Sequence, residues 1–245
     1  MTVFLTSSPT GPLDQSRVVH GIDDKNQLIE NLNRYWKADA GCLLICAAPS
    51  QADQNDEMRA HMMDALTQSG FPFRTFDLWD DRTEDFSQAA LCSYDVLFLG
   101  GGHVPTQNAF FRKIQLREKL RKFDGVVIGI SAGSMNSAEL VYAQPELPGE
   151  ATDPNYARFL EGLGLVRINL LPHYQMIKDA VLDGQRVFED ITYADSMGRE
   201  FIAIPDGSYL LSEQGTAAVY GEAYRIADGA MEKICEENQR RVIAP

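Results

Sequence analysis

The stretch Val126-Val127-Ile128-Gly129-Ile130-Ser131-Ala132-Gly133-Ser134 decides the fold. An apolar strand leads into the pattern Gly-x-Ser-x-Gly, and a helix is expected to follow. Small residues on both sides of Ser131 let the backbone bend sharply, so the serine projects from the sheet edge into solvent. The N–H of Ala132 can then face a developing oxyanion. The pattern favours a turn that presents a nucleophile over a tight turn with an incidental serine.

Short apolar runs recur on both sides of this stretch, separated by polar segments with helical spacing. Each run is rich in aliphatic residues, as strands buried on both faces of a parallel sheet are. The runs are Val3–Leu5, Cys42–Ala48, Phe73–Leu78, Asp95–Leu99, Val126–Ile130, Val166–Leu170, Phe201–Ile204, Tyr209–Leu211 and Ala217–Arg225. We expect one α/β domain over residues 1–245, with a single doubly wound, mostly parallel sheet flanked by helices.

Three further segments have distinct predictions. The last two runs are split by Glu213-Gln214-Gly215, which predicts a C-terminal β-hairpin. Residues 144–156 contain three prolines among polar residues and are expected to form a surface loop. Residues 177–191 carry scattered charges, as a surface helix would.

Composition bounds the class of protein. The chain has 245 residues and a formal net charge of -13, which argues against a nucleic-acid partner. Its four cysteines form no CxxC pair, so they are expected to be buried thiols in a reducing cytoplasm rather than a metal site. No apolar run is long enough to span a membrane. We therefore expect a cytoplasmic protein without a metal, an organic cofactor or a membrane partner; a homodimer is compatible with the sequence.

Three glycines, Gly100-Gly101-Gly102, follow the run Asp95–Leu99. Glycines let a backbone approach a ligand closely and point N–H groups at it. A phosphate cradle is the rival interpretation, but the Lys and Ser/Thr of a P-loop are missing. An oxyanion hole fits better, and His103, which comes next, is placed to touch a substrate.

A serine nucleophile needs a base and an acid that orients it. Of the four histidines, His173 is favoured because it ends an apolar run, and open α/β sheets bind ligands beyond the carboxyl ends of their strands. Asp206, in the turn Pro205-Asp206-Gly207, is the first candidate for the acid. Glu146, in the proline-rich loop, is the second. Pro-Asp-Gly is also a common turn, so Asp206 alone would carry little weight.

In combination, four motifs resemble peptidase family S51, which comprises the aspartyl dipeptidases (peptidase E) and the cyanophycinases. They are Gly-Gly-Gly at 100–102, Gly-Ile-Ser-Ala-Gly-Ser at 129–134, Leu-Pro-His-Tyr at 171–174 and Ile-Pro-Asp-Gly-Ser-Tyr at 204–209. The resemblance runs from about residue 95 to 221. It implies a fold like that of the class I glutamine amidotransferases, with serine in place of the usual cysteine.

The resemblance also implies roles for particular residues of a serine peptidase. Ser131 would be the nucleophile, His173 the base and Asp206 the third member, a position that is commonly Glu in peptidase E. The implied oxyanion hole consists of N–H groups of Gly101 or Gly102 and Ala132. Glu146 lies in the region of an earlier acid that has been considered in the family.

The implied reaction is hydrolysis of short aspartyl peptides, by a dipeptidase or exopeptidase, through an acyl-enzyme. Arg186 is the loose match for the basic residue that grips the substrate aspartate, and an acid such as Glu146 would suit the free amino group. Peptidase E has Asn-Thr after the glycines where this chain has His103-Val104-Pro105-Thr106. The alternatives are a β-aspartyl hydrolase like cyanophycinase and a catalytically silent binding module. A thiol enzyme is disfavoured because serine occupies the turn.

Overall fold

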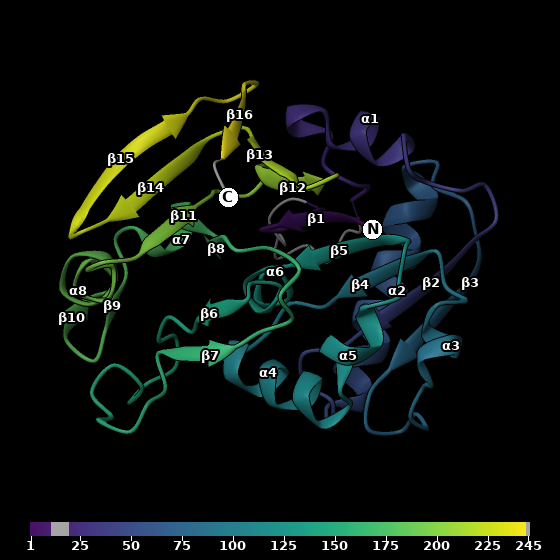
Figure 1. Ribbon diagram of the computed structural model, residues 1–245, viewed down its shortest axis with the longest axis horizontal. Coiled ribbons are helices and arrows are strands. Elements are labelled where there is room, and N and C mark those ends of the chain that lie inside the picture. The colour runs from purple at the N-terminus through teal and green to yellow at the C-terminus, as the bar shows by residue number, and fades with distance from the viewer. Residues whose placement is uncertain (11–19, 244–245) are drawn as a thin grey trace.

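The computed structural model describes residues 1–10 and 20–243, and an eight-stranded mixed sheet lies at its centre (Figure 1). The strand order is β16-β13-β12-β1-β5-β4-β2-β3. Strands β1 to β5 pair in parallel, and β12, β13 and β16 extend the sheet antiparallel. The strands are β1 (Thr2–Thr6), β2 (Ala40–Ile45), β3 (Phe73–Trp79), β4 (Val96–Leu99), β5 (Val126–Ile130), β12 (Tyr209–Glu213), β13 (Thr216–Tyr220) and β16 (Arg240–Ile243).

Helices cover both faces of this sheet because successive side chains of its strands point to opposite sides. Leu44 and Phe98 share a buried cluster with Leu66 of α2, whereas the neighbouring Leu43 and Leu99 pack in a second cluster with residues of α4 and α5. The helices are η1 (Lys25–Gln27), α1 (Leu28–Asn33), α2 (Ala52–Gln68), α3 (Gln88–Leu91), α4 (Val104–Lys113) and α5 (Leu116–Leu120). No helix in the described ranges is long and apolar enough to cross a membrane.

A second sheet lies beside the first, so the expectation of a single sheet is wrong (Figure 1). Its order is β15-β14-β11-β8, with β8 and β11 parallel. Leu170 and Ile202 of this sheet share a buried cluster with Leu210 of the main sheet, and this packing joins the two sheets. The strands are β8 (Asn169–Leu171), β11 (Glu200–Ala203), β14 (Ala223–Ala227) and β15 (Ala230–Cys235).

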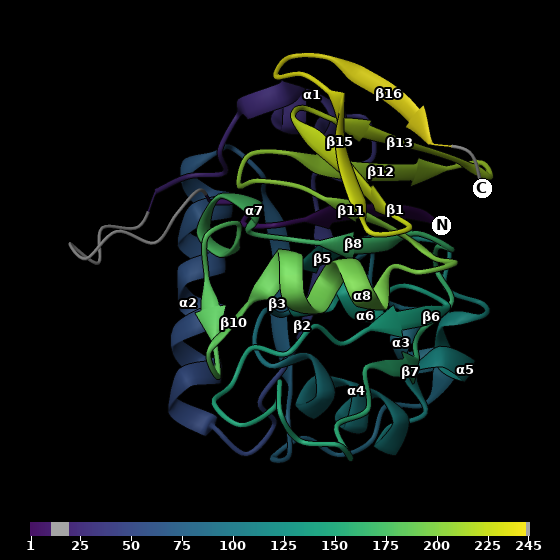
Figure 2. The same ribbon diagram turned by 90° about the vertical axis from the view of Figure 1, so that its left-hand side faces the viewer.

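The remaining elements are short. β8 pairs with β11 and packs against α6, and Figure 2 shows α7 and α8 on the face turned toward the viewer. Two small ribbons complete the fold, β6 with β7 and β9 with β10. The bounds are α6 (Ala132–Asn136), β6 (Leu140–Tyr142), β7 (Phe159–Glu161), α7 (Tyr174–Ile177), β9 (Val181–Leu182), β10 (Gln185–Arg186), η2 (Val187–Thr192) and α8 (Tyr193–Asp195).

Two segment predictions need correction. The run Ala217–Arg225 is not one strand, because the chain turns at Gly221, whose φ is 91°, and continues as β14 in the second sheet. β12 and β13 pair antiparallel around the turn Gln214-Gly215. Residues 177–191 form no surface helix: β9 and β10 are a hairpin around Asp183-Gly184, both at positive φ, and a π-helix follows. Asp-Gly at positive φ favours such a turn.

Candidate active site

Ser131 occupies the sharp turn between β5 and α6, with φ 49° and ψ -112°. An L-residue in such a conformation costs about 1–3 kcal/mol, so the surroundings must hold it there. The Ser131 N–H donates to the Thr6 carbonyl at 3.0 Å. A Cβ added at Gly129 would lie 2.9 Å from Ser134 Cα, and one at Gly133 would lie 2.1 Å from the Leu99 carbonyl oxygen. The turn therefore requires glycine on both sides of the serine.

We expect Gly133→Ala to lower the free energy of unfolding by about 1–3 kcal/mol, because the new methyl group must displace the backbone of β4. Urea denaturation measures the change. Gly70→Ala is the control: its φ is 76°, but nothing lies within 4 Å of the new Cβ, so it tests backbone strain without a clash. Strain of that kind costs about 1 kcal/mol. Equal stability of Gly133→Ala and the wild type would contradict this account of the turn.

His173 follows β8 and is also held at positive φ, 59°. Its Nε2 lies 2.9 Å from Ser131 Oγ, and its Nδ1 lies 2.8 Å from Asp206 Oδ1. The three side chains come from the ends of three strands: Ser131 follows β5, His173 follows β8 and Asp206 follows β11. The structure thus brings the three residues into one hydrogen-bonded row.

Several donors surround the Asp206 carboxylate, whose side chain is only 8% exposed. Burial raises the pKa of Asp206, but hydrogen bonds from His173 and Ser7 outweigh that effect and hold the pKa below its usual range. The Asp206 N–H also donates to Gln175 Oε1 at 3.0 Å. A carboxylate fixed in this way stays ionised and can orient an imidazole.

Ser7, directly after β1, is a member of the site that the sequence analysis missed. Its hydroxyl donates to Asp206 Oδ1 and accepts the His173 N–H at 2.8 Å. The residue is fully buried. Its place at the carboxyl end of a predicted strand was a signal that could have identified it. Ser7 therefore fixes the backbone of His173 and the carboxylate of Asp206 together.

We expect Ser7→Ala to lower the free energy of unfolding by about 1–3 kcal/mol, because the part-buried His173 N–H loses its acceptor. Urea denaturation gives the change, and Ser93→Ala, an exposed serine, is the control. Ser7→Thr keeps the hydroxyl and tests whether the hydrogen bonds matter. Unchanged stability of Ser7→Ala would show that the two hydrogen bonds contribute nothing measurable.

Two of the predicted oxyanion-hole residues, Gly101 and Ala132, lie next to the serine. A Cβ added at Gly101 would lie 3.4 Å from Ser131 Cβ, so the Gly101 backbone runs beside that side chain. Gly102 has φ 151°, and a Cβ there would lie 2.7 Å from Ala47 Cβ, so no side chain fits. Ala132 is buried at the start of α6. The Gly101 backbone and Ala132 therefore lie on either side of Ser131.

A cavity of about 200 Å³ opens beside Ser131 and His173, and Glu146 lines it. Glu146 is exposed as a residue, yet protein atoms crowd its carboxyl group, and this loss of water raises its pKa. The loop also carries Glu150, which binds His103 Nε2 at 2.8 Å and accepts the N–H groups of Glu146 and Leu147. His103 and Glu150 thus anchor the loop that presents Glu146.

The other predicted substrate residue, Arg186, lies elsewhere. Its guanidinium pairs with Asp190 at 2.7 Å, its side chain is 61% exposed, and it does not line the cavity. The structure therefore does not bring Arg186 to the serine. Among the described residues, no group of three His, Cys, Asp or Glu side chains could hold a metal ion.

The cysteines differ in burial. Cys42, Cys46 and Cys235 are buried and unpaired as expected, but Cys92 is exposed. Burial raises the pKa of Cys42 and of Cys46 to about 12. These two thiols therefore stay protonated near neutral pH and are poor nucleophiles.

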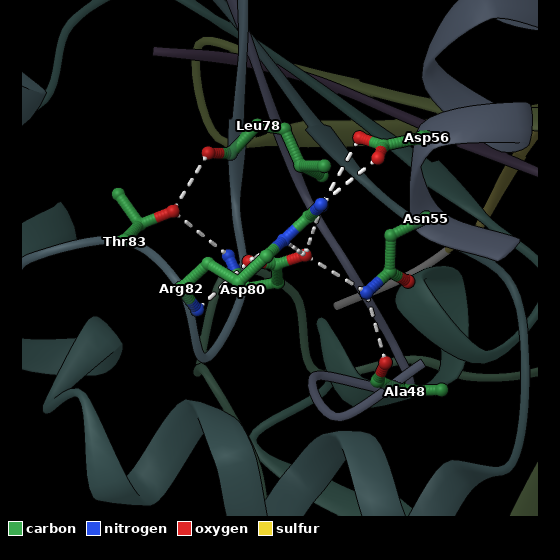
Figure 3. A network of polar contacts seen from close by, with 7 residues as sticks. All are labelled: Ala48, Asn55, Asp56, Leu78, Asp80, Arg82 and Thr83. Carbon is green, nitrogen blue, oxygen red and sulfur yellow. Dashed lines mark hydrogen bonds and ion pairs between the residues drawn. The ribbon is translucent and has the colours of Figure 1, made fainter. Parts of the chain in front are cut away.

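A second polar network lies at the end of β3 (Figure 3). A larger cavity of about 340 Å³ lies beside it. Buried Asp80 accepts hydrogen bonds from Arg82 at 2.7 Å and from Asn55 at 3.1 Å. Burial raises the pKa of Asp80, but the hydrogen bonds reverse the shift and hold it low. Arg82 also pairs with Asp56 of α2. Because its charges are mutually satisfied, this network serves to fix β3 against α2.

The fold and the site together define an α/β protein in which a serine, held at a strand-to-helix turn, is hydrogen-bonded to a histidine. The chain belongs to peptidase family S51, whose model matches residues 19–220. No curated protein matches it.

Two solved structures are similar to this chain. A peptidase from an acI-B1 actinobacterium is 14% identical, with a TM-score of 0.59 over 99% of this chain and 96% of that one. A peptidase E candidate from Listeria monocytogenes EGD-e is 16% identical, with a TM-score of 0.52 over 95% of this chain and 97% of that one. At these identities the likeness establishes the α/β fold with its large, mostly parallel sheet.

Proposed function

We propose that this member of a peptidase family is a serine-type enzyme that hydrolyses short peptides through an acyl-enzyme. One observation carries the proposal: Asp206, His173 and Ser131 form a continuous hydrogen-bonded row, with 2.8 Å and 2.9 Å between the paired atoms. Such a row is what a serine nucleophile needs, since the imidazole takes its proton and the carboxylate stabilises the resulting imidazolium.

In the proposed reaction, Ser131 Oγ attacks the carbonyl carbon of the peptide bond while His173 Nε2 takes its proton. N–H groups of Gly101 or Gly102 and of Ala132 stabilise the oxyanion. The tetrahedral intermediate expels the amine, which receives the proton from His173. A water molecule then attacks the acyl-enzyme by the same route, and the acid product leaves. This arrangement of nucleophile and glycine-lined turn is also what a fold like that of the class I glutamine amidotransferases would provide.

The aspartyl specificity that the family resemblance implies is a separate matter. Both α-aspartyl and β-aspartyl substrates carry a carboxylate that a cation would bind. Arg186, the candidate for that role, is paired with Asp190 outside the cavity. The contacts of Arg186 therefore give the aspartyl preference no support.

A catalytically silent binding module is the alternative, and a fluorophosphonate probe distinguishes it from the enzyme. We expect wild-type protein to be labelled at Ser131, located by mass spectrometry of the labelled peptide. His173→Ala should label far more slowly because the base is gone. His61→Ala, a histidine on α2 outside the site, is the matched control and should label like the wild type. Folded wild-type protein that resists the probe would refute the proposal.

A further inference from the structure

The cavity beside Ser131 has mainly apolar walls. Eight of its twelve lining residues have apolar side chains: two prolines together with Met135, Ile177, Ala180, Val181, Leu182 and Val187. Its volume of about 200 Å³ is large enough for one amino-acid side chain of moderate size and its backbone. An apolar side chain placed there would leave water and gain close packing.

The walls of the cavity are tied to each other. Asp183, at the tip of the β9–β10 hairpin, accepts the Gly149 N–H at 2.9 Å and the Ala151 N–H at 3.1 Å. The hairpin contributes Val181 and Leu182 to the lining, and the loop joined to it contributes Glu146. Because Asp183 joins the hairpin to the loop, the position of the Glu146 carboxylate relative to Val181 and Leu182 is fixed.

The charges at the cavity are unsuited to an acidic side chain. Glu146 is the one carboxylate among the lining residues, and no Lys or Arg of the described chain lines the cavity. An aspartate side chain would face Glu146 without a cation to compensate, which like-charge repulsion and loss of water both oppose.

Glu146 has the chemistry to receive a substrate's amino group. The hydrogen bonds of Glu150 to His103 and to the Glu146 N–H fix the loop on which the Glu146 carboxylate lies. A free ammonium group forms charge-assisted hydrogen bonds with such a carboxylate. Glu146 and Ser131 line the same cavity, so a residue held by its ammonium group would have its own carbonyl close to the nucleophile.

We infer that the preferred substrates are short peptides with an apolar amino-terminal residue, whose side chain fills this cavity and whose ammonium group pairs with Glu146. The inference rests on the proposed serine peptidase activity and names its substrate class. It departs from the aspartyl specificity that the family resemblance implies.

The test compares Leu, Asp and N-acetyl-Leu p-nitroanilides, which differ only in the group that forms the acyl-enzyme. We expect kcat/KM for Leu to exceed that for Asp by about 100-fold, as pocket discrimination of this kind allows. Acetylation removes the charge that Glu146 binds and should lower kcat/KM to a similar extent. Glu146→Gln should abolish the preference for the free amine. It should also reduce the preference for Leu over Asp, because it removes the carboxylate that repels an aspartate side chain.

A matched pair of variants tests the cavity itself. Val181 lines the cavity and is 63% exposed, whereas Val242 on β16 is 53% exposed and lies outside it. Val181→Arg should lower kcat/KM for Leu and raise it for Asp, each by about 10-fold. Val242→Arg should change neither value. Because both valines are exposed, neither substitution should disturb the fold.

Fluorophosphonate labelling separates failure of this inference from failure of the proposed function. If Ser131 is labelled and Asp substrates are cleaved as well as Leu substrates or better, the substrate class is refuted and the peptidase stands. If Ser131 is labelled but no anilide is cleaved, competition between dipeptides and the probe tests the substrate class. Leu-Ala must then slow the labelling of Ser131 at a concentration about 10-fold lower than Asp-Ala does, and equal or weaker protection by Leu-Ala refutes the inference. If Ser131 is neither labelled nor active, both proposals fall.

Discussion

Replacing Ser131 with alanine is expected to lower kcat for peptide hydrolysis by roughly 10⁴- to 10⁶-fold while leaving the fold intact. The substitution removes the atom that attacks the carbonyl and leaves the binding cavity in place. Residual hydrolysis by the oxyanion hole and by positioned water should remain above the uncatalysed rate. The KM of the residual activity should change little, because Ser131 makes its main contribution after the substrate is bound.

Steady-state kinetics on the Leu p-nitroanilide measures this loss, and urea denaturation measures the stability of the variant. Alanine keeps the Cβ of serine, so the backbone at φ 49° is no more strained than before. Ser93→Ala, an exposed serine, is the control for nonspecific effects of the substitution. If folded Ser131→Ala keeps a kcat within about 10-fold of the wild-type value, Ser131 is not the nucleophile.

Sequence reasoning located much of the candidate site because one geometric rule covers all its members. Residues at the carboxyl ends of neighbouring strands meet at one edge of the fold. That rule placed Ser131, His173 and Asp206 together, and the structure brings them within hydrogen-bonding distance. The three side chains meet even though β8 and β11 belong to a different sheet from β5, because β8 packs against α6, the helix that follows Ser131.

Other features depend on contacts between distant segments and leave weaker traces in the sequence. Ser7 acts only because its hydroxyl contacts residues more than 160 positions later. The hydrophobic pattern of residues 217–225 is compatible with one long strand. In the structure the chain turns at Gly221, and the second half of this run joins the other sheet. The β9–β10 hairpin is different: Asp183-Gly184 is a local signal for a tight turn, and the scattered charges around it favoured a helix instead.

Asp206→Asn is expected to lower kcat by roughly 10⁴-fold, whereas Glu146→Gln should leave the chemical step much less affected. Asn has the size of Asp but no charge, so it cannot stabilise an imidazolium or enforce the same tautomer of His173. Asp206 lies 2.8 Å from His173 Nδ1, while Glu146 lines the cavity on the loop that Glu150 anchors. The kcat values of the two variants on the Leu p-nitroanilide rank the two acids.

The same pair of variants has a signature in stability. The folded-state pKa of Asp206 lies below its unfolded value, which is about 3.9, so the charged carboxylate stabilises the fold above that pH. This contribution is lost as the pH falls through the lowered pKa of the folded state. The difference in free energy of unfolding between the wild type and Asp206→Asn should therefore be constant near neutral pH and shrink in acid.

Because the pKa of Glu146 is raised instead, Glu146→Gln should show the opposite trend: the stability of the wild type relative to the variant should increase as the pH falls. If Glu146→Gln proves the more damaging to kcat while Asp206→Asn keeps its dependence on pH, the loop supplies the orienting acid and Asp206 is a structural carboxylate.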